Sequence, residues 1–106
     1  MKASIEINVT VYLYQQFTTF NTGERDEIIT HDNVFADKEK AMKALKIGEF
    51  PNVEDGFPFE GICGECYQHH VEYELNGEKV WEIRRETPQG DGKWAYEGNR
   101  VIEKIF

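Results

Sequence analysis

The middle third of the sequence contains no basic residue. Twelve lysines and arginines stand against twenty aspartates and glutamates among the 106 residues, which gives a formal charge of −8 and a pI near 4.8. None of the twelve lies between Lys46 and Lys79. This shortage argues against a protein that binds nucleic acid directly, because affinity for phosphates comes from lysine and arginine side chains that displace counterions.

Other features that mark large classes of protein are also missing. The chain has no run of about 20 apolar residues that could span a membrane, and no apolar run typical of a secretory signal. It has neither a glycine-rich phosphate loop nor a nucleophile motif, which argues against an enzyme. We therefore expect a non-enzymatic protein of the cytoplasm (the host-cell cytoplasm if phage-encoded), whose two cysteines stay reduced.

The gap in basic residues localises the negative charge. Eight of the twenty acids fall inside it, so this segment carries the whole imbalance. One interpretation is a solvated face that keeps a small protein soluble, and the other is a surface that meets a basic groove on a partner protein. Phe57 and Phe59 suit such an interface as apolar anchors, with packing beneath the loop as the alternative. The predicted partner-binding residues are Glu54, Asp55, Phe57, Phe59, Glu60, Glu65, Glu72 and Glu74.

The apolar pattern predicts a single domain over residues 1–106. Apolar residues make up 40% of the chain and aromatic residues 13%, which is enough for one core. Apolar and polar residues alternate from Ala3 to Tyr14, which predicts a long half-buried strand that continues with a bend to Phe20. A second strand over residues 26–35 is expected to complete a hairpin with it.

A helix and then a long loop are expected next. Asp37 is a suitable N-cap, and apolar residues from Ala41 to Ile47 recur with helical spacing. Gly48 is expected to end the helix in the left-handed conformation. Glycines and prolines within residues 49–67 predict a loop, whose length calls for a function or a cross-link.

The second half of the chain is expected to return to strands. Asn76-Gly77 is a strong signal for a hairpin turn. A two-residue turn would set Trp81 beside Glu72, whereas a three-residue loop would set it on the face of Tyr73. We favour the three-residue loop because it buries the tryptophan.

Two further strands complete the prediction. A short one is expected around Trp94 and Tyr96, a turn at Gly98-Asn99, and a closing strand over residues 101–106. The predicted fold class is α+β, with a mostly antiparallel sheet of about five strands, one helix and a zinc-knuckle loop at the cysteines.

One short segment carries metal-binding chemistry. Residues 63–70 hold both cysteines of the chain and two of its three histidines. The thiolates of Cys63 and Cys66, three positions apart, suit one zinc ion bound from a tight turn, and Gly64 permits the backbone geometry of that turn. We therefore predict a structural zinc site. A redox dithiol and two unligated cysteines are the alternatives.

The histidine ligands are left open. His69 and His70 are neighbours, so on a regular strand they point to opposite faces, and both can ligate only if the strand begins after His70. Otherwise His31, on an earlier strand, would complete the site. Glu60 and Glu65 are weaker candidates.

A very short, acidic chain with one zinc-type knuckle and no catalytic motif resembles the small anti-CRISPR proteins of phages and mobile elements, some of whose type II inhibitors contain metal. The resemblance implies a non-enzymatic inhibitor that occupies a basic nucleic-acid-binding surface of a type II CRISPR effector nuclease. Such an inhibitor would block nucleic-acid loading or cleavage. The positively charged channel of the nuclease is complementary to an acidic protein. The alternative is a small structural-zinc adaptor or subunit domain that mediates protein–protein contacts.

Overall fold

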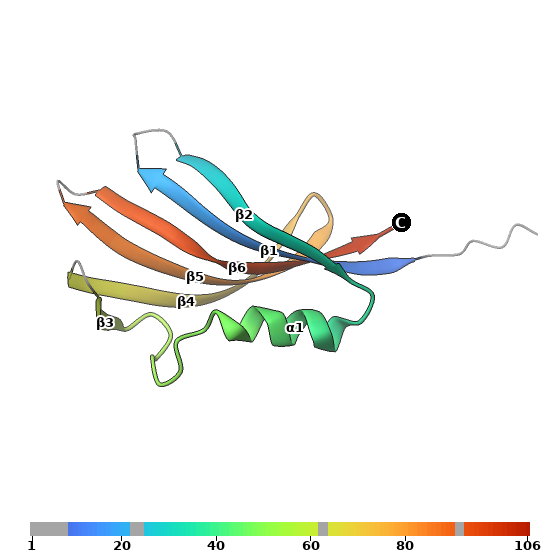
Figure 1. The fold of residues 1–106 in the computed structure, drawn as a ribbon, viewed down its shortest axis with the longest axis horizontal. Helices are drawn as coiled ribbons and strands as arrows, with labels where there is room; N and C mark the ends of the chain where they lie inside the picture. Colours follow the sequence, from blue (N-terminus) through green and yellow to red (C-terminus); the bar gives the residue numbers. More distant parts are fainter. Residues whose placement is uncertain (1–8, 22–24, 62–63, 91–92) are drawn as a thin grey trace, which may run out of the picture.

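In the computed structural model, one helix packs against one face of a six-stranded antiparallel sheet (Figure 1). The structure describes residues 9–21, 25–61, 64–90 and 93–106. The elements are β1 (Thr10–Asn21), β2 (Arg25–Phe35), α1 (Lys38–Ile47), β3 (Pro58–Gly61), β4 (Gly64–Leu75), β5 (Glu78–Gly90) and β6 (Lys93–Ile105). The strand order is β2-β1-β6-β5-β4-β3, so β1 and β6 pair in the middle of the sheet although they are far apart in sequence.

The predicted α+β class is confirmed, but the strand count of about five was too low. The sixth strand, β3, lies in the segment predicted to be a loop, and β4 also begins inside that segment. Phe59 of β3 pairs with Cys66 of β4, so this backbone finds its hydrogen bonds in the sheet despite the nearby glycines and prolines. A zinc-knuckle loop is not part of the described fold, and Cys63 lies outside the described residues.

The first hairpin and the helix follow the prediction closely. β1 and β2 pair antiparallel, although the part of the predicted first strand from Ala3 to residue 8 lies outside the described residues. Asp37 caps α1, because its carboxylate accepts a hydrogen bond from the Glu39 N–H at 2.9 Å. Gly48 is not left-handed, since its φ is −82°. A Cβ at this position would lie 1.7 Å from the end of the buried Asn99 side chain, which would have to move to admit it.

The hairpin between β4 and β5 uses the two-residue turn, so the favoured three-residue loop was wrong. Asn76 and Gly77 both have positive φ, of 53° and 81°, as expected when both central residues of the turn are left-handed. Glu72 therefore pairs with Trp81. The helix covers the tryptophan, with Lys38 Nζ 4.7 Å from the centre of its ring.

The predicted turn at Gly98-Asn99 is also wrong, because β6 runs through it without a break. A Cβ on Gly98 would lie 2.1 Å from the main-chain oxygen of Ile83 on β5, so this glycine permits close approach between strands. Asn99 is buried, and its side-chain amide contacts the end of α1 at Leu45 and Gly48.

The two faces of the sheet differ. The helix contacts β1, β2, β5 and β6, and the core beneath it consists of Tyr14, Ala41, Leu45, Ile83 and Val101. We call this the helix face. No described element covers the opposite side, which we call the open face (Figure 1). Side chains alternate between the faces along each strand.

Candidate functional site

The six predicted partner-binding acids lie at one margin of the sheet. They come from the segment after the helix and from β3 and β4, which form the end of the strand order opposite β2. All six are exposed. We call this set the acidic edge: Glu54, Asp55, Glu60, Glu65, Glu72 and Glu74.

The negative charges of the acidic edge have few ion-pair partners among the described residues. Glu60 and Glu65 are direct partners across β3 and β4, so two like charges stand opposite each other on one face. Such a pair destabilises a sheet by itself. Apart from Asp55, no member of the acidic edge forms an ion pair with any residue that the structure describes.

The two predicted apolar anchors differ in exposure. Phe57 is 62% exposed and stands between Asp55 and Glu60 in the sequence. Phe59 is half-buried, with its ring 5.4 Å from that of Phe50 in an edge-to-face contact. Phe57 is therefore available to a partner, whereas Phe59 packs beneath the segment.

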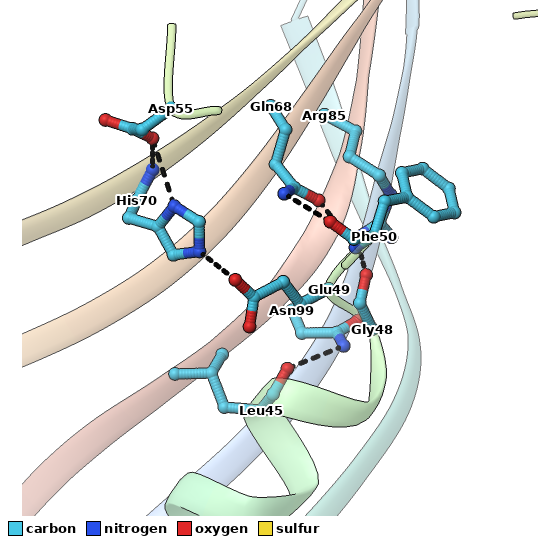
Figure 2. Close-up of polar contacts among 9 residues, drawn as sticks. All are labelled: Leu45, Gly48, Glu49, Phe50, Asp55, Gln68, His70, Arg85 and Asn99. Carbon is cyan, nitrogen blue, oxygen red and sulfur yellow. Dashed lines mark hydrogen bonds and ion pairs between the residues drawn. The ribbon is translucent and has the colours of Figure 1, made fainter. Parts of the chain in front are cut away.

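A clamp formed by Gln68 and Arg85 fixes the segment after the helix, which carries Glu54 and Asp55 of the acidic edge (Figure 2). The Gln68 side chain is completely buried; its oxygen accepts from the Phe50 N–H at 2.8 Å and its nitrogen donates to the Phe50 carbonyl at 3.2 Å. Arg85 donates to the Gly48 carbonyl and lies 5.2 Å from the Phe50 ring. These contacts hold the chain where it leaves the helix, and no local pattern in the sequence predicts them.

His70 fixes the same segment further along (Figure 2). Its main-chain N–H and its ring Nδ1 both contact Asp55 Oδ1, the ring nitrogen at 3.0 Å, and Nε2 lies 2.9 Å from Glu49 Oε1. The main-chain hydrogen bond from His70 is the chief reason that the pKa of Asp55 lies below its ordinary value of 3.8; burial opposes it, and the His70 side chain lowers the pKa further.

A fall in pH should therefore weaken the contact between Asp55 and His70. A carboxylate whose pKa is lowered by folding stabilises the folded chain above its unfolded pKa, and this stability is lost as the pH falls through the folded pKa. We expect Asp55→Asn to be less stable than the wild type at pH 7, with a difference that disappears as the pH falls below 3.8. Urea denaturation across this range measures it, with Glu54→Gln as the control; a difference that is constant with pH would contradict the assignment.

The predicted zinc ligands are only partly brought together. Cys66 is buried on the helix face with His70, whereas His69 points to the open face, as expected for neighbours on a regular strand. His31 lies on β2, with β1, β6 and β5 between it and β4, so it is about 19 Å away and cannot share an ion with Cys66.

No group of three or more histidine, cysteine, aspartate or glutamate side chains in the described part of the chain is arranged to hold a metal. Cys63 lies outside that part. Both ring nitrogens of His70 already face carboxylates, so His70 would have to leave Glu49 or Asp55 to ligate. A zinc site stays a prediction that now centres on Cys63 and Cys66, and metal analysis of the purified protein tests it.

The open face holds a second group of charges that sequence reasoning missed. Glu82 is buried on β5, and both Nε (2.8 Å) and Nη2 (2.6 Å) of Arg84 contact its Oε2. Arg100 Nε lies 3.2 Å from Glu82 Oε1, its Nη2 pairs with Glu27, and its guanidinium stands 4.1 Å from the Phe17 ring. Arg84-Arg85 is thus no basic cluster, because the two side chains point to opposite faces.

These charges lie in a groove of about 520 Å³ on the open face. Its aromatic lining comes from Phe17, Tyr73 and Tyr96. Tyr73 donates to Glu82 Oε1 at 3.2 Å, and burial together with the Glu82 charge raises the pKa of this tyrosine above its ordinary value. The groove is a polar and aromatic hollow whose arginine charges are matched by internal carboxylates.

Comparison with protein-family models, with curated proteins and with solved structures found no match. Within the described ranges, no helix is long and apolar enough to cross a membrane. The function therefore has to be inferred from the acidic edge and from the groove on the open face.

Proposed function

We propose that this protein is a non-enzymatic binding protein whose acidic edge occupies a basic, nucleic-acid-binding surface of another protein. The observation that carries the proposal is the run of exposed acids without described ion-pair partners, and above all the opposed pair Glu60 and Glu65. Repulsion between two like charges destabilises the fold of the free protein. A basic partner would remove that repulsion by placing positive charge beside both carboxylates.

The clamp supports the same proposal. Gln68 and His70 hold the segment between α1 and β3 against β4, so Glu54 and Asp55 are in place before a partner arrives, as are the acids on the strands. A surface that is already ordered loses less conformational entropy on binding than a flexible one. The exposed ring of Phe57 would add an apolar contact among the charges.

The resemblance to anti-CRISPR proteins suggests which partner to test first. A type II CRISPR effector nuclease holds its guide–target duplex in a positively charged channel, which an acidic edge complements. We propose that the protein enters such a channel and blocks nucleic-acid loading or cleavage. The test is cleavage of target DNA by several guide-loaded type II nucleases with and without the protein; if none is inhibited, this choice of partner is wrong.

Charge reversal at Glu65 should separate binding from folding. Glu65→Lys turns the opposed pair with Glu60 into an attractive pair, so we expect the free energy of unfolding to rise by about 0.5 kcal/mol. The same change should weaken partner binding at least about tenfold, because a lysine then faces a basic surface. Thermal melts and a titration of the inhibition measure the two effects.

Asp32→Lys is the matched control. Asp32 is also an exposed acid, but it lies on β2 at the other margin of the sheet, and its reversal changes the net charge by the same amount. Equal loss of binding in both variants would show that general acidity, and not the acidic edge, attracts the partner.

A further inference from the structure

At one end of the groove, the open face carries a cluster of aromatic side chains around Glu86, and this cluster shares Glu86 and Tyr96 with the groove lining. Tyr67 of β4, Glu86 of β5 and Tyr96 of β6 are successive partners across three strands, so they lie side by side on this face. Trp94 adds a third ring, 5.8 Å from that of Tyr67. We call Tyr67, Glu86, Trp94 and Tyr96 the aromatic box.

Among the three carboxylates that line the groove, Glu27, Glu82 and Glu86, only Glu86 has no arginine partner in the described part of the chain. Arg84 is held by Glu82, and Arg100 lies between Glu82 and Glu27. The His69 ring stacks on Tyr67, and its Nε2 lies 3.6 Å from Glu86 Oε2. The Glu86 side chain is 25% exposed and also lines the groove, so a ligand can reach it.

We propose that the aromatic box binds the guanidinium group of an arginine side chain presented by a protein partner. Aromatic rings attract a cation at their faces, and a carboxylate among them supplies the opposite charge. Guanidinium suits this site better than ammonium, because it is flat enough to stack on tyrosine and can bind a carboxylate with two parallel hydrogen bonds.

The proposal does not depend on the acidic edge. It uses none of the residues of that edge, and its test needs no partner protein. Its probe is N-acetyl-arginine amide, added to the ¹⁵N-labelled protein while amide chemical shifts are recorded. We expect saturable shifts at Tyr67, Glu86 and Tyr96, and no such shifts with N-acetyl-citrulline amide, which has nearly the same shape without the charge.

Two variants make the experiment decisive. Glu86→Gln should weaken binding of the probe at least about fivefold, because it removes the charge but keeps the shape of the side chain. Glu65→Gln removes a nearby carboxylate of the acidic edge and should leave the affinity unchanged. Equal weakening by both variants, unchanged binding in Glu86→Gln, or equal shifts with citrulline would overturn the proposal.

The aromatic contribution needs its own variant. Tyr96→Leu keeps an apolar side chain on β6 but removes the ring, and we expect a loss of affinity similar to that of Glu86→Gln. A wild-type circular dichroism spectrum would show that the variant is folded. Affinity of Tyr96→Leu equal to the wild type, or equal binding of N-acetyl-lysine amide by the wild type, would contradict an aromatic site for guanidinium.

Discussion

Replacing Gly98 with alanine should destabilise the protein by about 3 kcal/mol, which is a large effect for the addition of one methyl group. The added Cβ would lie 2.1 Å from the carbonyl oxygen of Ile83 and 3.1 Å from the Cα of Arg84. Both are main-chain atoms of the neighbouring strand, so no rotamer change relieves the contact. β5 and β6 would have to separate in the middle of the sheet.

The measurement for Gly98→Ala is thermal unfolding followed by circular dichroism. A loss of this size in a domain of about 100 residues corresponds to a fall in Tm of about 10–20 °C. Glu97→Ala, at the adjacent exposed position of β6, is the control and should change stability by no more than about 0.5 kcal/mol. Equal melting of Gly98→Ala and the wild type would show that β5 and β6 do not approach as closely as described.

The second large effect is expected at Gln68. Replacing it with leucine keeps an apolar stem of similar size but removes both hydrogen bonds to Phe50. The Phe50 N–H and carbonyl would then lose their partners in a partly buried place, which costs about 2–3 kcal/mol. The two hydrogen bonds of the Gln68 amide therefore contribute more to the free energy of unfolding than the apolar contacts of a leucine would.

Two measurements distinguish this effect from general destabilisation. Urea denaturation of Gln68→Leu gives the change in unfolding free energy, and hydrogen exchange should show lost protection at the Phe50 amide, with the β1–β6 pair still protected. Gln16→Leu is the matched control, because the Gln16 side chain is exposed and makes one hydrogen bond, to the Tyr14 hydroxyl. Unchanged exchange at Phe50 would contradict the clamp.

Local patterns in the sequence are sufficient to predict the first hairpin and the helix. Asp37 caps α1 through a contact two residues away, so the information lies within one turn of chain. The turn after β4 could not be predicted in the same way. The sequence favours a three-residue loop that would bury Trp81 on the face of Tyr73, but the helix, which comes earlier in the chain, covers Trp81 on the opposite face.

Parts of the candidate site also follow from the sequence alone. Exposure of the acidic edge follows from composition, because carboxylates without nearby basic residues stay in water. The opposite directions of His69 and His70 follow from strand alternation. The contacts of Gln68 with Phe50 and of Glu82 with Arg100 do not follow from local sequence, because the two residues of each pair are 18 positions apart. Only the assembled sheet brings them together.

The pairing of β1 with β6 has a consequence for how the protein folds. Thr10 meets Ile105, so the two ends of the described chain must find each other before the middle of the sheet exists. All other neighbouring strands are consecutive in sequence. Closing so long a loop is slow compared with forming a hairpin. Two partial sheets, β1–β2 and β3–β6, should therefore form early, and until they dock the unpaired sides of β1 and β6 are the surfaces most open to aggregation.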